Sequence, residues 1–385
     1  MSSEFRILTV VGWKISKVDQ DDKGRHPANL LLPEERYWFF RYWKDERLRV
    51  DVMGLHRHIA FERRFLHFYL WTPFKALLKA SRHDLILCFH SQLGLPLALM
   101  MKVLKVNTPL VVFDVEGFGR KNSLWQRWLV HRALSRVSLV FYLAKVQRED
   151  YANYYPEVLN RAEFLPLGVD PARFPCPERK TEDYILSVGY QGSDFRDWRT
   201  LLEAYSRLKT KTKLLIVGRS GFRRTEIGDS ALRNVEFVKS CDLPTLNEYA
   251  LKSRFVILPL ADRRQALGQM TLLGAMALGK AVLVSKVPGV IDYVMDGQSG
   301  LLYQPGDPHD LAQKANRLLS HPGEAEKLGR AAKNAIESKF HQRTMAARIL
   351  EILRERRLLT DFPDSPAPTS DRIRETMVME KECLV

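Results

Sequence analysis

A polar loop at residues 262–269 separates a predicted strand from a predicted helix, and its surroundings suit it to binding an anion. Residues 255–260 are an apolar run of the β type, and residues 271–278 have the apolar spacing of a helix. Ligands of parallel sheets bind at the carboxyl ends of the strands, where such a loop lies. The first helical amides, near Met270 and Thr271, have no acceptor within the helix and carry a partial positive charge. A phosphate group would satisfy them, although many strand-loop-helix units bind nothing.

Titratable residues suited to chemistry also follow predicted strands in the first half of the chain. His90 comes after the apolar run 84–89, and Asp114 and Glu116 come after the run 109–113. Because the carboxyl ends of parallel strands lie at one edge of a sheet, these side chains could contact the hydroxyl groups of a second substrate. Each of them could equally be a helix cap or a turn residue.

The elements that must hold these residues alternate between strand and helix. In the first 165 residues, apolar runs predict strands at 5–11, 84–89, 109–113 and 139–144 and a helix at 94–104. Such alternation is typical of a parallel, doubly wound α/β sheet.

A second series of the same kind follows a proline-containing connection near residues 165–180. Its predicted strands are residues 184–189, 213–218, 235–238, 255–260 and 282–285, and its predicted helices are residues 198–208, 243–252, 271–278, 311–320, 324–340 and 342–358. We therefore predict an α/β protein with two Rossmann-like, doubly wound domains that face a cleft.

The predicted boundaries follow from these runs. They are an N-terminal Rossmann-like domain at residues 1–168, a C-terminal Rossmann-like domain at 169–340, a C-terminal helix at 341–359 and a tail at 360–385. The helix either closes the second domain or crosses back to the first. The tail is rich in Pro, Ser and Asp, which predicts disorder.

The net charge of +15 is high for a chain whose apolar content of 45% and charged content of 27% are ordinary. It predicts attraction to nucleic acid, an anionic membrane surface or a phosphorylated substrate. The four cysteines show no CxxC spacing, so neither a zinc site nor a disulfide framework is indicated and a reducing cytoplasm fits best. No secretory signal and no run of about 18 apolar residues is visible. We therefore expect a cytoplasmic protein, either soluble or peripheral at the inner membrane face.

Aromatic and basic residues interleave in three segments, at residues 37–49, 61–82 and 123–136. In the third segment Trp125 and Trp128 lie at helical spacing with arginines nearby. Basic amphipathic helices that carry tryptophan fit peripheral contact with an anionic membrane, and packing in a core is the alternative. Nucleic acid is disfavoured, because no RNA- or DNA-binding motif is present and the basic residues lie on helices rich in Trp and Leu.

Three stretches resemble the motifs of one enzyme family. They are LPLGVDPARF at residues 165–174, SVGYQGSDFRDWRTLLEAY at 187–205 and GQMTLLGAMALGKAVLVSKVPGVIDYVMDGQSGLLYQPGDP at 268–308. They are similar to the interdomain and donor-site motifs of the retaining, nucleotide-sugar-dependent glycosyltransferases with the GT-B fold, family 4. The likeness covers the second domain closely and the first domain only in architecture.

The resemblance implies that the second domain holds a nucleotide-diphosphate sugar and that the first presents the acceptor. Arg196 stands where the family has a lysine that stabilises the leaving diphosphate, and the amides of Gln269 to Thr271 would hold the same charge. Such enzymes usually need no bound metal, so the nucleotide sugar is a co-substrate and no cofactor is expected. The donor-binding residues expected on this basis are Gly189, Tyr190, Arg219, Arg263, Gly268, Gln269, Met270 and Thr271.

The donor-site motifs depart from the family pattern. Ala266 and Gly274 replace two glutamates, and the second glutamate normally accepts hydrogen bonds from the ribose. Tyr190 replaces an arginine, so a phosphate contact would have to come from Arg219, or from Arg263 and Arg264, instead.

The first domain departs as well. The family's histidine of the catalytic region falls near Val115, which leaves Asp114 or Glu116, or His90 from a neighbouring strand. Together with Arg196, these three residues are the expected catalytic set.

The leading hypothesis is a retaining glycosyltransferase of the hexosyl type. It would move a sugar from a nucleotide-diphosphate donor to a lipid-linked, glycan or other envelope-type acceptor. The absent glutamates favour an alternative, a catalytically degenerate GT-B partner or scaffold in a glycan-assembly complex. A nucleotide-sugar epimerase is a third candidate.

Overall fold

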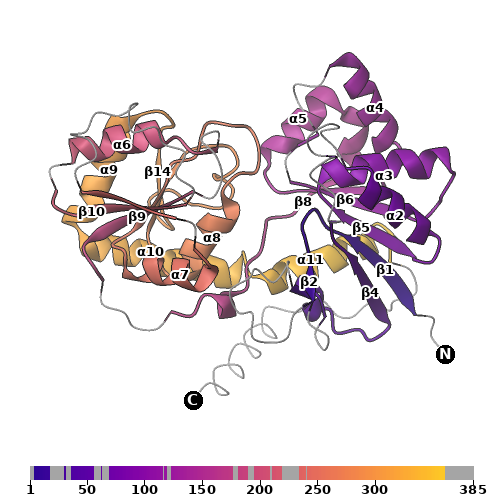
Figure 1. Ribbon diagram of the computed structural model, residues 1–385, viewed down its shortest axis with the longest axis horizontal. Helices are drawn as coiled ribbons and strands as arrows, with labels where there is room; N and C mark the ends of the chain where they lie inside the picture. Colours follow the sequence, from indigo (N-terminus) through magenta and orange to yellow (C-terminus); the bar gives the residue numbers. More distant parts are fainter. Residues whose placement is uncertain are drawn as a thin grey trace. The chain divides into compact units, whose positions relative to one another are not determined.

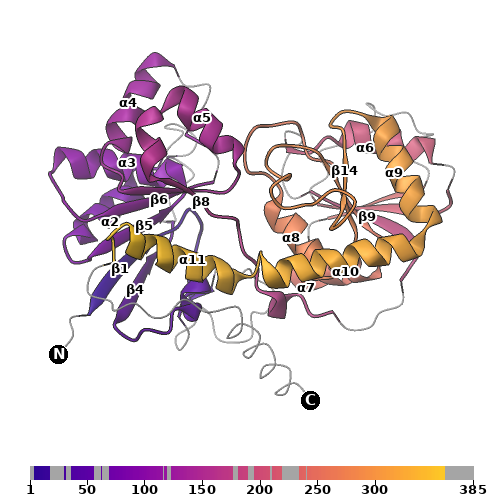
Figure 2. The ribbon, with the colours of Figure 1, turned by 180° about the vertical axis from the view of Figure 1, so that it is seen from behind.

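The computed structural model describes residues 4–17, 30–31, 36–55, 62, 69–115, 117–118, 123–176, 181–189, 195–208, 210–218, 234–239 and 241–359 (Figures 1 and 2). Contacts group residues 1–349 into one compact unit and residues 350–385 into another. The predicted tail, 360–385, lies outside the described residues.

The first unit contains two six-stranded sheets, and every strand pairing in them is parallel. The N-terminal sheet has the order β4-β1-β5-β6-β7-β8, with β1 (Phe5–Val10), β4 (Leu48–Met53), β5 (Leu85–Phe89), β6 (Leu110–Asp114), β7 (Leu139–Tyr142) and β8 (Ala162–Phe164). The C-terminal sheet has the order β11-β10-β9-β12-β13-β14, with β9 (Tyr184–Gly189), β10 (Lys213–Gly218), β11 (Val235–Val238), β12 (Val256–Leu258), β13 (Val282–Ser285) and β14 (Leu301–Tyr303). The prediction of two doubly wound α/β sheets is confirmed.

Helices connect the strands and cover the sheets. Those of the N-terminal half are α2 (Trp71–Ala80), α3 (Ser91–Val103), α4 (Leu124–Leu134) and α5 (Val146–Tyr154), with short 3-10 helices η2 (Trp38–Tyr42) and η3 (Pro156–Arg161). Those that follow are η4 (Pro171–Arg173), α6 (Trp198–Arg207), α7 (Leu243–Lys252), α8 (Gln269–Ala277), α9 (Pro308–Ser320), α10 (Pro322–Ser338) and α11 (Gln342–Glu355). Two short strands, β2 (Ser16–Lys17) and β3 (Leu30–Leu31), pair apart from both sheets.

Both faces of the C-terminal sheet are covered. Figures 1 and 2 show α6 and α9 on one face and α7, α8 and α10 on the other. The inner strands are accordingly continuous apolar runs rather than alternating ones, as in β12, VIL, where all three residues are buried.

Three helices of the C-terminal half begin at an aspartate whose side chain accepts a hydrogen bond from an early helical amide. The pairs are Asp197 with the amide of Thr200, Asp242 with Thr245, and Asp307 with Asp310, at donor-acceptor distances of 3.1, 3.0 and 3.0 Å. Such caps satisfy amides that the helix leaves without acceptors. The helix α8 has no side-chain cap, so its first amides remain available.

The segment at residues 37–49 is not the amphipathic helix expected from its sequence. It forms η2 and then runs into β4, and Trp38, Phe39 and Trp43 are buried. The rings of Trp38 and Phe39 pack against Phe89 of β5, with centroids 5.0 and 5.9 Å apart. Of the two alternatives for this segment, the structure shows packing in a core, because these aromatic side chains cover the sheet.

The start of α11 contacts the N-terminal half. The indole nitrogen of Trp43 donates a hydrogen bond of 2.9 Å to the carbonyl oxygen of Ala346.

Among the described residues, no helix combines the length and the apolar character that crossing a bilayer requires.

Candidate active site

The strand order of the C-terminal sheet marks where a ligand should bind. The chain winds from β9 outward to β11, returns, and continues through β12 on the other side of β9. In doubly wound sheets, ligands bind at the carboxyl ends of the strands where the winding reverses. Here those ends are Gly189 of β9 and Leu258 of β12, and they lead to Arg196 and to the loop before α8.

The N-terminus of α8 is the first element at this edge that is suited to an anion. Gly268 precedes the helix with a φ of 77°, a left-handed conformation that residues with a Cβ rarely adopt. The side chain of Gln269 points away from the free amides, since its amide nitrogen donates a 2.7 Å hydrogen bond to the carbonyl oxygen of Gly289. The first amides of this nine-residue helix thus lack both a helical acceptor and a side-chain cap.

Arg196 is the second such element. Only 8% of the residue is exposed, yet within the described residues no carboxylate pairs with its guanidinium. Its hydrogen bonds go to the carbonyl oxygens of Val188 and Phe195, at 3.1 and 3.3 Å. Burial lowers the pKa of Arg196 to about 10, because removal from water disfavours the charged form. A buried cation without a counter-ion is costly, so this site calls for an anion.

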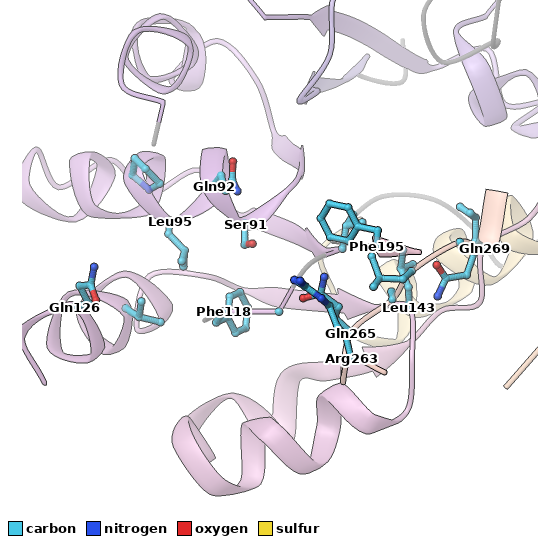
Figure 3. A pocket seen from close by; sticks show the side chains of 18 of the residues that line it. Ser91, Gln92, Leu95, Phe118, Gln126, Leu143, Phe195, Arg263, Gln265 and Gln269 are labelled. Atoms are coloured by element: carbon cyan, nitrogen blue, oxygen red, sulfur yellow. The ribbon is translucent and has the colours of Figure 1, made fainter. Parts of the chain in front are cut away.

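One cavity of about 1130 Å³ contains both elements (Figure 3). Its lining from the C-terminal half includes Phe195, Arg196, Arg263, Gln265, Ala266, Leu267, Gly268, Gln269, Met270 and Thr271. Its lining from the N-terminal half includes Ser91, Gln92, Leu95, Pro96, Leu99, Met100, Val115, Gly117, Phe118, Trp125, Gln126, Leu129, Val130 and Leu143. Five of the predicted donor-binding residues, Arg263, Gly268, Gln269, Met270 and Thr271, are therefore brought together with Arg196.

Asp114 lies at the end of β6 but does not line this cavity. Its carboxylate is fully buried and accepts hydrogen bonds from Tyr151 Oη at 2.7 Å and from the amide of Gly117 at 3.0 Å. The side-chain amide of Gln147 donates to the Asp114 carbonyl at 2.8 Å, and Ser91 also hydrogen-bonds to the carboxylate. Burial raises the pKa of Asp114 to about 6, and these hydrogen bonds oppose the rise. This burial does not fit the acceptor contact expected for Asp114, because its carboxylate hydrogen-bonds to residues that surround the end of β6 instead.

His90 also lies at a strand end without lining the cavity. It precedes α3 with a φ of 90°, which is unusual for a residue with a side chain. Its ring packs against Gly12 and stands edge-on to Trp13, with centroids 5.8 Å apart. The expected catalytic role of His90 is therefore not supported by its surroundings.

The remaining expected residues fall into two groups. Glu116, Tyr190 and Arg219 lie outside the described residues. Gly189 ends β9 as a buried residue beside the ring of Trp198, and it does not line the cavity.

The two positions that lack the family's glutamates have structural explanations. Ala266 is buried in a small apolar cluster with Leu143 and Val146. At Gly274, an added Cβ would lie 3.0 Å from Cε1 of Phe174, so the aromatic ring fills the space a longer side chain would need. A ribose contact from position 274 is therefore incompatible with this packing.

Gln265 and Phe195 are two of the cavity residues that the sequence analysis did not identify. Gln265 lines the cavity one residue before Ala266, and Figure 3 shows its side chain beside Arg263. Phe195 supports Arg263, whose guanidinium carbon lies 5.2 Å from the ring centroid. Gln265 could have been identified from the sequence, because it is a polar residue next to the position of the absent glutamate. Phe195 could not, because its contact with Arg263 depends on the fold.

The two six-stranded parallel sheets with their flanking helices define the class of protein, the GT-B fold. Residues 182–321 match the protein family described as glycosyl transferases group 1. The crystal structure of HepE from Anabaena in complex with UDP has a TM-score of 0.65 at 15% identity, covering 91% of this chain and 100% of that one. At this identity the likeness shows the fold alone.

Curated relatives agree with that class. Glycogen synthase of Mycobacterium tuberculosis is 26% identical over 246 residues, which is 61% of this chain and 58% of that protein. D-rhamnosyltransferase WbpZ of Pseudomonas aeruginosa is 31% identical over 195 residues, which is 47% of this chain and 49% of that protein. The matches thus span about half to three fifths of these relatives. The chain therefore has the GT-B fold, and its similarity to glycosyltransferases agrees with the resemblance seen in its three motifs.

Proposed function

We propose that this protein transfers a sugar, of the hexosyl type, from a nucleotide-diphosphate donor to an envelope-type acceptor, with retention of configuration. The observation that carries the proposal is the buried guanidinium of Arg196, which has no anionic partner among the described residues and shares a cavity with the uncapped start of α8. A diphosphate supplies the missing charge to both. The UDP complex of HepE, which has the same fold, supports a nucleotide as the donor.

The proposed chemistry needs negative charge to be stabilised on the leaving group. The acceptor hydroxyl oxygen bonds to the anomeric carbon, and the bond from that carbon to the diphosphate oxygen breaks. The nucleoside diphosphate leaves with the electron pair, and the hydroxyl proton passes to one of its phosphate oxygens. Arg196 and the amides of α8 stabilise the charge that develops there, so this chemistry requires no resident metal ion or cofactor. Retention follows from attack on the face from which the diphosphate leaves.

Nucleotide titration tests the donor site. We expect one member of a panel of UDP, ADP, GDP and TDP to give saturable heat in calorimetry and to raise the melting temperature. The variant Arg196→Ala should lose about 10- to 100-fold in affinity, because a hydrogen bond to a charged group contributes about 1.5–3 kcal/mol.

The matched control is Arg199→Ala, on the exposed side of α6, which begins two residues after Arg196; there Arg199 pairs with Glu203 at 2.8 Å. Its nucleotide affinity should equal that of the wild type. Unchanged affinity in Arg196→Ala would remove this residue from the donor site.

The proposal includes peripheral contact with an anionic membrane. The helix α3 packs between α2 and α4, and these three helices carry Lys75, Lys79, Lys102, Arg127 and Arg132 but no Asp or Glu. Their outer surface, called here the basic apolar face, exposes Trp71, Phe74, Leu78, Val103, Leu104, Leu124, Trp125 and Trp128. Tryptophan with nearby cations suits the interface of an anionic bilayer.

Vesicle sedimentation tests this contact. The protein should bind vesicles of phosphatidylglycerol and phosphatidylcholine, and binding should weaken with salt and with phosphatidylcholine alone. The variant Trp71→Gln/Trp128→Gln should bind several-fold less. The control Ile291→Gln/Met295→Gln removes exposed apolar side chains from the C-terminal half and should bind normally. Equal loss in both variants would contradict a specific face.

A second candidate function is a degenerate GT-B scaffold in a glycan-assembly complex. The packing of Phe174 against Gly274 favours it, because a ribose contact common in the family has no room there. A scaffold should give no heat with any nucleotide of the panel, whereas a transferase must bind one.

A further inference from the structure

The cavity has two chemically different ends. Figure 3 shows Arg263, Gln265 and Gln269 together at one end, with Leu95 and Gln126 at the other. The second end is formed by two neighbouring helices, α3 and α4, and their apolar side chains dominate its lining. These are Leu95, Pro96, Leu99 and Met100 of α3 and Trp125, Leu129 and Val130 of α4.

The apolar end is poorly suited to a bare glycan. A sugar buried there would need a partner for nearly every hydroxyl group, since an unpaired buried polar group is costly. The two helices contribute only Ser91, Gln92 and Gln126 as polar side chains to the lining. A hydrocarbon chain needs no such partners and gains by leaving water.

The same end connects with the basic apolar face. Trp125 lines the cavity and is also 62% exposed, and Trp128, one turn further along α4, is 57% exposed. Leu70, which lines the cavity, immediately precedes Trp71 at the start of α2. A molecule with its tail at this end therefore meets the part of the surface that best suits a bilayer.

We propose that the apolar end, built by α3 and α4, binds the hydrocarbon chain of a lipid-linked acceptor and directs its polar head toward the Arg196 end. This inference rests on the proposed function, and it selects one acceptor class among the lipid-linked and glycan acceptors. The charge pattern agrees: an amphiphile with an anionic phosphate head matches a cavity that is apolar at one end and cationic at the other.

A binding assay without vesicles tests the chain site. Farnesyl phosphate, kept below its aggregation threshold, is titrated by calorimetry, with inorganic phosphate and maltose as probes that lack a chain. We expect farnesyl phosphate to bind at least tenfold more tightly than either. The variant Leu95→Gln/Leu99→Gln should lose at least tenfold in farnesyl phosphate affinity and keep its nucleotide affinity, because both leucines are half-buried in the apolar end.

The matched control is Ile291→Gln/Met295→Gln, which changes exposed apolar residues outside both the cavity lining and the basic apolar face. It should bind farnesyl phosphate like the wild type. Equal binding of inorganic phosphate and farnesyl phosphate, or unchanged affinity in Leu95→Gln/Leu99→Gln, would overturn the chain site.

The two proposals fail separately. Absence of nucleotide binding in the wild type would contradict the donor site, even if farnesyl phosphate binds. Normal nucleotide binding and sugar transfer to maltose, without farnesyl phosphate binding, would leave the transferase intact and overturn the lipid-linked acceptor.

Discussion

Asp114 and Arg196 are both buried charged residues near the carboxyl ends of a parallel sheet, but their surroundings differ. The carboxylate of Asp114, in the N-terminal half, accepts hydrogen bonds from Tyr151 and Gly117, with Ser91 and Gln147 also in contact. Arg196, in the C-terminal half, has two carbonyl oxygens and no anion among the described residues. The protein itself supplies hydrogen-bond partners for the carboxylate, whereas the proposed partner of the guanidinium is a bound diphosphate.

This difference is the one expected between a charged side chain that supports the fold and one that is available to bind a ligand. The pKa of Asp114 is raised to about 6, and the pKa of Arg196 is lowered to about 10, in both cases mainly by burial. Only Arg196 faces the cavity, so only its burial can be offset by a bound diphosphate. A shifted pKa therefore indicates a binding site only where the group faces a cavity in which a ligand can bind as its partner.

The largest expected effect is on catalysis. Replacing Arg196 with alanine should lower turnover by about 10²–10³-fold, the range for losing one preorganised charge-stabilising donor. Arg196→Lys should be intermediate, since lysine keeps the charge without the planar fork. Nucleotide release measured with saturating donor and acceptor gives these rates.

The free energy of unfolding of Arg196→Ala, measured without ligand, tests the difference between Arg196 and Asp114. Because the wild type buries an unpaired cation, its removal should leave the ligand-free free energy of unfolding unchanged or higher. A large loss of ligand-free stability would mean that Arg196, like Asp114, is already completed by the protein.

The sequence predicted the fold well because both sheets are made of apolar runs separated by turns. The limits of β10, β11 and α7 agree with the predicted ranges 213–218, 235–238 and 243–252. The sequence left residues 37–49 undecided, because their alternating aromatic and basic residues suit both an interface and a core. Only the tertiary contact with Phe89 decides between them. The three-residue strands β8 and β14 are too short to give a periodic signal.

The site could be predicted only in part. Arg196 and residues 268–271 belong to contiguous motifs, so their place in the cavity could be anticipated. The residues of α3 and α4 come from distant parts of the chain, and only the fold brings them to the same cavity. Asp114 was placed at the correct strand end, but the inward direction of its side chain depends on Tyr151 and Gln147.

The next effect concerns pH and Asp114. Its pKa of about 6 in the folded protein exceeds the ordinary value of 3.8, so the folded state binds more protons between these values. Stability is therefore greatest below pH 4 as far as this group is concerned, and it falls as pH rises through 6. The fall is roughly 3 kcal/mol, at about 1.4 kcal/mol for each pKa unit. Chemical denaturation from pH 4 to 7 should show this slope in the wild type and lack it in Asp114→Asn.

A smaller effect on the free energy of unfolding is expected at Gly268, which precedes α8. Gly268→Ala should reduce the free energy of unfolding by about 2 kcal/mol, because alanine is strained at a φ of 77° and its Cβ would lie 2.7 Å from Cδ2 of Leu260. The control Gly297→Ala has a φ of 71° but nothing within 4 Å, so it should cost only about 1 kcal/mol. Equal losses would show that Leu260 moves aside freely.

The smallest effect should come from Arg264, which is partly exposed and paired, unlike Arg196. Arg264 is partly exposed and pairs with Glu149 of α5 at 2.6 Å. This ion pair joins the loop before α8 to the N-terminal half. Exposed pairs of this kind contribute about 0–1 kcal/mol, because water and salt screen them. A double-mutant cycle with Arg264→Ala and Glu149→Ala should therefore give a coupling energy below about 1 kcal/mol that shrinks in salt. A coupling well above that value would mean that the pair is shielded from water, and the contrast between a paired surface arginine and the unpaired buried one would not hold.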